Sequence, residues 1–327
     1  MTSPARQQRQ ARDRRISLAL AVLIGLVVGI GGFFILHYRP SFAPTVSPGK
    51  ATAPLPLTLL PHKALYGVSM VSARNGSQVI DIDGKMFFQM HQGCDAYITD
   101  HRFVLTYDYA DSTPMRVTSD FSTVESMDGK TFDFSSRRRR DGELYQELRG
   151  KAVMPQAGMG QAVYALPADL TFDLAAGTRF PAMHTRDLIT AARAGKSFLS
   201  ARIFDGSDEE GPLDVTAIIT PAKDVVLPSG TMIAQEALVR PAWRVHLAFF
   251  PTTSVSETAD YELTMILHEN GVISDMTIDY RDFSVHQQLL ALDPLVPDGC
   301  DDQETPQKST VQQPPTGVPV PADRPLR

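Results

Sequence analysis

The sequence predicts a mainly β protein of antiparallel strands with one central helix, preceded by a transmembrane helix. Apolar and polar side chains alternate along most of residues 62–300, which is the period of a half-buried strand. Glycine-containing turn dipeptides separate these alternating runs, and an uncharged apolar run lies near the N-terminus. The chain is therefore expected to divide into an anchor, a linker, one β domain and a tail.

The N-terminal residues have the charge pattern of a signal-anchor. Residues 1–15 carry five arginines and one acidic residue, so they are expected to form a cytoplasmic basic segment. Residues 16–38 contain no Asp, Glu, Lys or Arg, and a helix of that length is roughly 35 Å long, enough to cross a bilayer. The alternative is a cleaved signal peptide, because Ser41-Phe42-Ala43 has the small residues of a cleavage site. Either interpretation exports the rest of the chain.

Two proline-rich segments bound the predicted β domain. Residues 39–61 contain six prolines and are expected to form an extended linker. Residues 301–327 contain six prolines, four glutamines and no aromatic residue. They cannot bury enough apolar surface to fold alone, so we expect a disordered tail. The folded domain is therefore predicted to span residues 62–300.

Four alternating runs are the clearest predicted strands, in two β-rich halves at about 62–174 and 200–292. In each run apolar side chains take every second position, which is typical of an antiparallel sheet with one buried face. Their apolar members are Ile80, Ile82, Met86, Phe88 and Met90; Trp243, Val245, Leu247 and Phe249; Tyr261, Leu263, Met265 and Leu267; and Met276, Ile278 and Tyr280.

Turn and helix signals lie between the runs. A helix is predicted at about 185–194, with Thr185 as N-cap and Gly195 after its C-terminus. Tight turns are predicted at Asp83-Gly84, Asp128-Gly129, Asp141-Gly142 and Asn270-Gly271. At the first of these a bulge or bend is the alternative, because the alternation continues on both sides.

Net charge and cysteine content indicate which partners and which redox compartment suit this protein. The net charge of −6 argues against nucleic acid as a partner of the domain. The only cysteines are Cys94 and Cys300, and an even count in an exported chain suits one disulfide bond. Two unrelated free thiols are the alternative.

Catalytic and metal-binding motifs are not recognisable, so we predict no enzyme activity, no metal and no cofactor. The eight histidines are scattered, and no nucleophile elbow occurs. The acidic, turn-rich segment 205–211 lacks the spacing of an EF-hand and is expected to be a solvated loop. Spatial triads remain open, which leaves a hydrolase as the least favoured alternative.

Two groups of residues are candidates for ligand contacts. The first is the arginine run Arg137, Arg138, Arg139 and Arg140, which is either a solvated strand end or a contact for anionic head groups, since guanidinium forks match phosphate geometry. The second is apolar: strand faces of this kind either close a dry core or line a ligand cavity. The candidate cavity residues are Met86, Phe88, Trp243, Tyr261 and Met276.

Several stretches resemble one family, in the same order along the chain. Residues 61–66 (Pro-His-Lys-Ala-Leu-Tyr), 94–97 around Cys94, 172–185 from Phe172 to Thr185, 204–208 and 278–283 are similar to the EipB-type cell-envelope integrity proteins of alphaproteobacteria. Cys300 lies where the second cysteine of the family is expected. The resemblance covers about residues 61–300.

This resemblance implies a fold and a role. The fold would be an antiparallel β-spiral, or broken barrel, with one internal helix and a cysteine bridge. The role would be that of a non-enzymatic periplasmic factor that maintains the cell envelope and accepts a lipid-like or amphiphilic ligand. A scaffold that docks an envelope protein is the alternative, and the inner membrane would be contacted through the N-terminal helix.

Overall fold

The computed structural model describes residues 57–223, 232–252 and 258–297. The predicted cytoplasmic segment, signal-anchor and tail, almost all of the predicted linker, and Cys300 lie outside these residues. Within the part of the chain that is described, no helix is long and apolar enough to cross a membrane.

One antiparallel sheet of 14 strands makes up most of the described chain. The strands are β1 (His62–Ala73), β2 (Val79–Gln92), β3 (Ala96–Tyr109), β4 (Ser112–Ser126), β5 (Thr131–Arg140), β6 (Glu143–Val153), β7 (Gly160–Leu166), β8 (Thr171–Leu174), β9 (Phe198–Ile203), β10 (Leu213–Pro221), β11 (Ala242–Pro251), β12 (Tyr261–His268), β13 (Ile273–Tyr280) and β14 (Phe283–Pro294). A helix, α2 (Pro181–Arg193), separates β8 from β9, and a 3₁₀ turn, η1 (Gln235–Ala237), precedes β11. The predicted mainly β, antiparallel class is confirmed.

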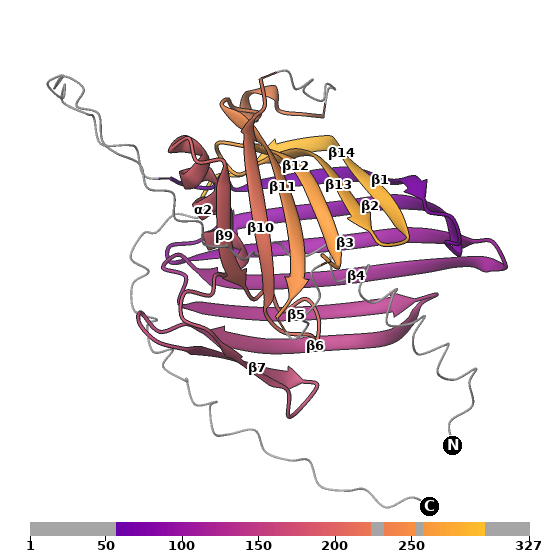
Figure 1. Ribbon diagram of the computed structural model, residues 1–327, viewed down its shortest axis with the longest axis horizontal. Coiled ribbons are helices and arrows are strands. Elements are labelled where there is room, and N and C mark those ends of the chain that lie inside the picture. Colours follow the sequence, from indigo (N-terminus) through magenta and orange to yellow (C-terminus); the bar gives the residue numbers. More distant parts are fainter. Residues whose placement is uncertain (1–56, 224–231, 253–257, 298–327) are drawn as a thin grey trace, which may run out of the picture.

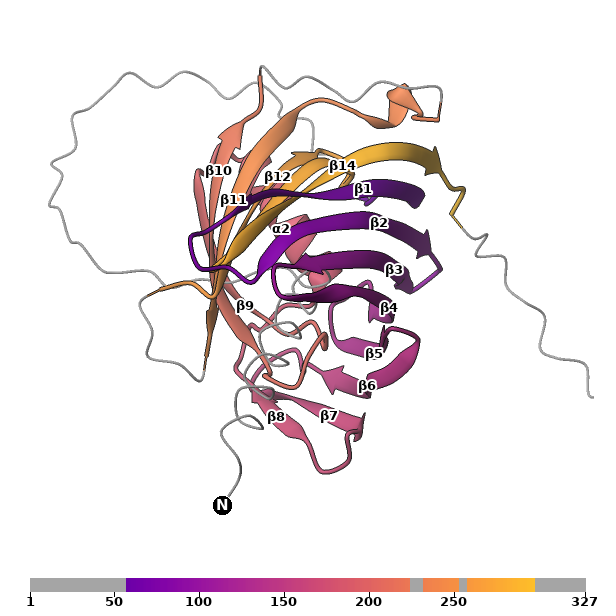
Figure 2. The ribbon, with the colours of Figure 1, turned by 90° about the vertical axis from the view of Figure 1, so that its right-hand side faces the viewer.

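The chain enters the sheet in the middle and runs outward from β1 to β8 at one edge, and then it returns from β9 at the other edge inward to β14. The strand order is β8-β7-β6-β5-β4-β3-β2-β1-β14-β13-β12-β11-β10-β9, so the first strand pairs with the last. We call β1–β8 the N-terminal wall and β9–β14 the C-terminal wall. The sheet curls so that the strands of the C-terminal wall cross those of the N-terminal wall at a steep angle (Figures 1 and 2). The result is an open, barrel-like shell.

Helix α2 lies between the two walls at one end of the shell (Figures 1 and 2). Its predicted C-terminus is confirmed, because Gly195 and Lys196 donate to the carbonyls of Ala192 and Ala191 at 3.0 and 2.9 Å, the two bonds of a Schellman motif. Its predicted start is wrong: the helix begins at Pro181, not near Thr185. Proline suits the first helical position, because an N–H group there would have no intrahelical partner and its loss costs no hydrogen bond.

Three of the four predicted turns are confirmed. They connect β4 to β5, β5 to β6 and β12 to β13, and positive φ angles at Asp141 and Gly142 suit a tight hairpin turn. The tight turn predicted at Asp83-Gly84 is wrong, because β2 continues through both residues and its pairing with β3 has no register shift there. A β-carbon on Gly84 would lie 2.1 Å from the carbonyl oxygen of Val104, so glycine permits close approach of β3.

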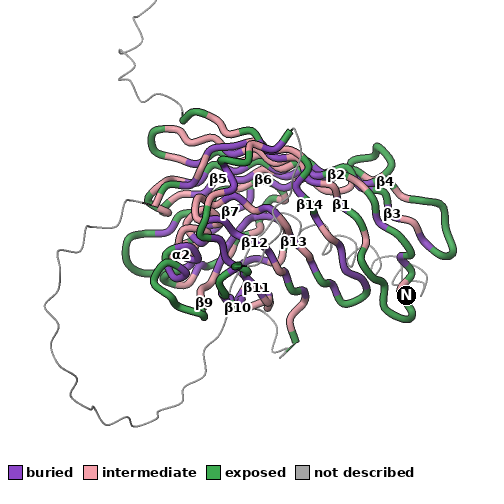
Figure 3. The backbone as a smooth tube through the Cα atoms, turned by 90° about the horizontal axis from the view of Figure 1, so that it is seen from above, coloured by how far each residue is buried: buried purple, intermediate pink, exposed green. Residues whose placement is uncertain are grey.

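The core lies between the walls, where buried segments gather (Figure 3). Side chains from both walls and from α2 join in one hydrophobic cluster. The hydroxyl of Tyr66 in β1 donates to the carbonyl of Ile273 in β13 at 2.8 Å and ties the walls together. One predicted inward residue faces outward: Ile80 is 55% exposed, because the register shifts between Val79 and Asp81.

Candidate ligand-binding site

The five predicted cavity residues all belong to the interior of the shell. Met86, Trp243, Tyr261 and Met276 are buried members of the large hydrophobic cluster, and the half-buried Phe88 packs against it. They come from β2, β11, β12 and β13, so both walls contribute. Phe88 also contacts the rings of His62 and His101, at centroid distances of 5.0 Å. A role for these five residues in ligand binding stays a prediction.

The inward faces of β4 and β5 carry polar side chains among apolar ones. In β4, Ser119 and Glu125 share the buried face with Phe121, and in β5 Ser136 and Arg138 share it with Phe134. Sequence reasoning singled out neither serine and missed Glu125. The signal that would have found them is parity, because these residues stand an even number of positions from the large apolar residues of their strands.

Arg138 has no exposed surface. Its Nη1 donates to Oε1 of Gln146 on β6, and its Nη2 donates to the carbonyl of Ser207, both at 2.6 Å. Burial lowers the pKa of the guanidinium, while Tyr145, Asp208 and Asp205 act in the opposite direction. Two hydrogen bonds and nearby carboxylates therefore stabilise a guanidinium group that has no contact with water.

This arrangement corrects the prediction for the arginine run. Arg138 cannot contact a membrane head group, since it is enclosed by the protein. Arg140 is half-buried, with its guanidinium 4.9 Å from the ring centroid of Tyr145. Arg137 and Arg139 are exposed on the outer face, where Arg137 pairs with Glu147 at 2.9 Å. Contact with anionic head groups stays a prediction for these two residues alone.

The acidic segment 205–211 is also different from the prediction. It was expected to be solvated, yet Asp205 and Ser207 are only 5% and 2% exposed. Arg138 holds Ser207, and the hydroxyl of Tyr164 donates to the carbonyl of Asp208 at 2.6 Å. Burial raises the pKa of both Asp205 and Asp208. Glu209 is exposed, but residues 205–207 are buried because a charged partner from β5 compensates them, which local composition does not reveal.

An aromatic cluster surrounds this segment. The ring centroid of Phe134 lies 4.9 Å from that of Tyr164 and 5.6 Å from that of Phe204. Phe132 stacks on Phe180 with a centroid distance of 5.0 Å. Gly206, at φ +66°, lies directly under Phe134, where a β-carbon would come within 2.4 Å of the ring. Only glycine fits at this position. The aromatic cluster therefore packs segment 205–211 closely against the N-terminal wall.

Glu125 anchors α2 to the same wall. Its carboxylate accepts the backbone N–H groups of Ala182 and Met183, at 2.7 and 2.8 Å, and so caps the helix N-terminus from β4. Glu125 is 2% exposed, and burial raises its pKa to about 7 against the opposing effect of these hydrogen bonds and of Arg186. This cap explains why the helix starts at Pro181.

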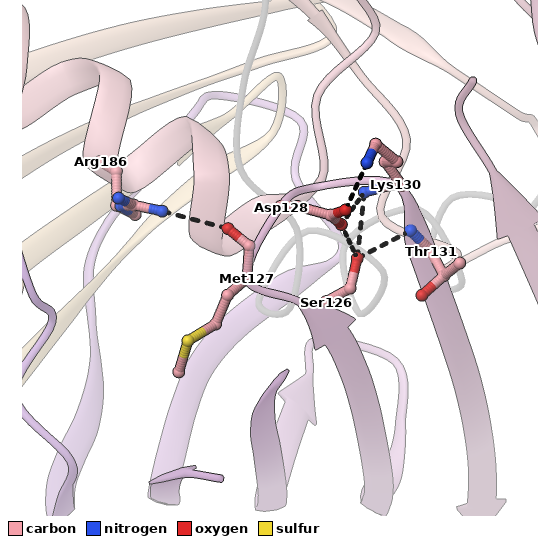
Figure 4. Close-up of polar contacts among 6 residues, drawn as sticks. All are labelled: Ser126, Met127, Asp128, Lys130, Thr131 and Arg186. Atoms are coloured by element: carbon pink, nitrogen blue, oxygen red, sulfur yellow. Dashed lines mark hydrogen bonds and ion pairs between the residues drawn. The ribbon is translucent and has the colours of Figure 1, made fainter. Parts of the chain in front are cut away.

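The turn that follows Glu125 continues the contact with α2 (Figure 4). Oγ of Ser126 accepts the N–H groups of Lys130 and Thr131, at 3.0 and 2.9 Å, which fixes the turn. Arg186 then donates from α2 to the carbonyl of Met127 at 3.3 Å. Two consecutive contacts therefore place the helix at the end of the shell.

The cysteines and one histidine of the helix also bear on the sequence predictions. Cys94 lies between β2 and β3 and is not a free thiol, but Cys300 lies outside the described residues, so the bond between them stays a prediction. His184 in α2 is fully buried, and burial lowers its pKa to about 3. Among the described residues, no three His, Cys, Asp or Glu side chains are grouped to hold a metal ion.

These features define a class: an antiparallel, barrel-like shell with an internal helix and a mixed apolar and polar interior. Comparison with known proteins gives the family. The EipB-like family matches residues 54–296, and the chain belongs to it. This confirms the resemblance seen in the sequence.

Two relatives support this assignment. The cell envelope integrity protein EipB of Brucella abortus (strain 2308) is 32% identical over 250 residues, which cover 75% of this chain and 88% of the relative. A crystal structure of a β-barrel-like protein of a domain of unknown function from Brucella abortus has a TM-score of 0.68 and 29% identity. It covers 73% of this chain and 100% of the solved one.

Proposed function

We propose that this protein is a non-enzymatic factor of the cell envelope, which holds a lipid-like or amphiphilic molecule between its two walls. The relative in Brucella abortus is named for cell envelope integrity, and family membership supports the same role here. The N-terminal arginines and the apolar run 16–38 support a site of action on the periplasmic side of the inner membrane, with the helix retained as an anchor or removed as a signal.

The observation that carries the ligand proposal is the composition of the interior. In the N-terminal wall, β4 and β5 present buried serines and a buried arginine beside phenylalanines, while β11 and β12 of the C-terminal wall present aliphatic and aromatic side chains and β14 adds the buried Gln287. An amphiphile has both kinds of surface. Apolar contacts would provide affinity at roughly 25 cal/mol per Å² removed from water, and a few polar groups would orient the ligand.

Native mass spectrometry of protein extracted from its own membranes tests this proposal. We expect a co-purifying lipid-like species that is lost when Leu247 or Met265 is replaced by tryptophan to fill the interior. Tryptophan at the exposed position Ile218 is the matched control and should leave the bound species unchanged. A protein that carries no lipid, and that binds no envelope lipid when these are added, would contradict the proposal.

A scaffold role is the second candidate, and one surface feature favours it. Phe198 and Ile218 are cross-strand partners on β9 and β10, and they are 48% and 51% exposed. β9 is the terminal strand of the sheet, and Arg179 bridges the end of its outer edge at Ile203. The part of this edge before Arg202 suits the addition of a strand from another protein. Cross-linking in cells separates the two roles: a dominant protein adduct that survives the interior tryptophan substitutions would favour the scaffold.

A further inference from the structure

Among the buried polar atoms of the N-terminal wall that have no hydrogen-bond partner, three belong to buried residues on the adjacent strands β4 and β5. They are Oγ of Ser119, Oγ of Ser136 and Nε of Arg138, and no described residue pairs with them. All three residues are at most 1% exposed. A buried polar group without a partner costs roughly 1–3 kcal/mol, and native proteins contain few of them.

These three atoms come from adjacent positions. Ser119 on β4 is the direct cross-strand partner of Arg138 on β5, and Ser136 lies two residues before Arg138 on the same face. Gln146 and Ser207 fix the other two nitrogens of the guanidinium, so Nε–H is held in one direction. The site is therefore preorganised, which lowers the entropic cost of binding.

Apolar side chains surround the polar atoms. Ser119 pairs with Phe103 on β3, and Ser136 pairs with Phe121 on β4 and with Leu148 on β6. Along the same strands toward the β5–β6 turn, the inward-facing Met115 and Arg140 are half-buried. The polar atoms thus lie just inside the rim of the shell, within an apolar lining.

The charges around Arg138 restrict the ligand. Asp205, Asp208 and Glu209 all lie close enough to stabilise the guanidinium electrostatically. A second anion would meet these carboxylates, so it would gain little from the arginine. An uncharged oxygen, such as an ester carbonyl or a glycerol hydroxyl, would accept from Nε–H and pair with the serine hydroxyls without that repulsion.

We propose that Ser119, Ser136 and Nε of Arg138 bind the uncharged, oxygen-bearing group of an amphiphile whose chain lies against the apolar interior. This inference rests on the proposed amphiphile-binding function and specifies its ligand class. Membrane acylglycerols have this chemistry, and so do small polyols without a chain.

Calorimetric titration of the purified full-length protein tests the inference with three ligands of equal chain length: monododecanoylglycerol, dodecanoate and dodecyltrimethylammonium. We expect the uncharged glyceride to bind most tightly. In the double variant Ser119→Ala, Ser136→Ala its affinity should fall by roughly tenfold, as expected for the loss of two hydrogen bonds. Binding of dodecyltrimethylammonium, which has no acceptor, should not change.

The matched control is the double variant Ser122→Ala, Ser135→Ala. These serines pair with each other on the same two strands but lie on the outer face, so the glyceride should bind as to wild type. A second readout is the melting temperature without ligand. The inner double variant should melt at the same or a higher temperature, because it removes unpaired buried hydroxyls.

The possible outcomes separate the two proposals. If all three ligands bind wild type equally and the inner double variant changes nothing, the polar site is wrong while amphiphile binding stands. If no ligand binds wild type, the proposed function fails, and the polar site falls with it. If glycerol alone displaces the glyceride, the site serves a small polyol and the amphiphile is excluded.

Discussion

Two strands of the C-terminal wall and two strands of the N-terminal wall use their inward-facing positions differently. On β11 and β12 of the C-terminal wall these positions are all apolar: Trp243, Val245, Leu247, Phe249, Tyr261, Leu263, Met265 and Leu267. On β4 and β5 of the N-terminal wall they include Ser119, Thr123, Glu125, Ser136 and Arg138. Both walls enclose the same interior, so burial alone does not require the polar residues.

The difference shows what each wall contributes. The strands β11 and β12 supply apolar surface alone, which stabilises the fold. In the N-terminal wall Glu125 caps α2 and Arg138 holds the segment after β9, whereas Ser119 and Ser136 have no such structural contact among the described residues. Four substitutions, from the largest expected effect to the smallest, test this division.

Arg138→Met should be the most destabilising change, by about 3–5 kcal/mol in the free energy of unfolding. It leaves Asp205 without its compensating charge and frees the carbonyl of Ser207. Arg139→Met, one position away on the outer face, should change stability by less than about 0.5 kcal/mol. Urea denaturation of both variants measures the contrast, and equal effects would mean that Arg138 is not buried.

Leu247→Ala should cost about 2–5 kcal/mol, because it opens a cavity in the fully buried centre of the C-terminal wall. Leu290→Ala, at a position 36% exposed on β14, should cost much less. The same denaturation experiment measures both. A small loss at Leu247 would indicate that this wall is loosely packed and that the comparison between walls is misplaced.

Cys94→Ser tests whether a disulfide bond also connects the two walls, since Cys94 follows β2 and Cys300 follows β14 in the sequence. For a disulfide bond, Cys94→Ser and Cys300→Ser should each cost about 2–5 kcal/mol under oxidising conditions. The double variant should lose no more than either single one. Additive losses in thermal unfolding would show that the two thiols are not paired.

Glu125→Gln should change how stability depends on pH. The pKa of Glu125 rises from 4.5 to about 7 in the folded protein, so the folded state holds the proton more tightly than the unfolded chain. Its contribution to stability is therefore complete below about pH 4.5 and is lost as the pH rises through about 7. The loss is on the order of 3 kcal/mol.

Melting temperatures of wild type and Glu125→Gln between pH 4 and pH 8 measure this effect. The difference between the two curves isolates Glu125, because Asp205 and Asp208 titrate in both proteins. Wild type should lose stability relative to the variant as the pH rises. A constant difference across this range would place the carboxyl group in water rather than under α2.

Local patterns predicted the elements well, and contacts between distant residues explain the errors. The turn at Asp141-Gly142 follows from the backbone freedom of two adjacent residues, so sequence alone locates it. The start of α2 depends on Glu125, which lies 57 positions before its hydrogen-bond partner Ala182. The local capping signals around Thr185 contain no trace of this contact. The hydroxyl of Thr185 instead donates to the carbonyl of Pro181 at 3.0 Å, inside the helix.

The sequence by itself determined the antiparallel β class, most of the turns and the end of the helix, because the strand period of two and the chemistry of turns act over a few residues. Only the tertiary structure decided which of four consecutive arginines is buried and that the first part of an acidic segment, residues 205–207, lies inside the protein. Both outcomes depend on Arg138 meeting Ser207, which lies 69 residues away. A buried charge is stable only when its partner is present, and the partner is supplied by the fold.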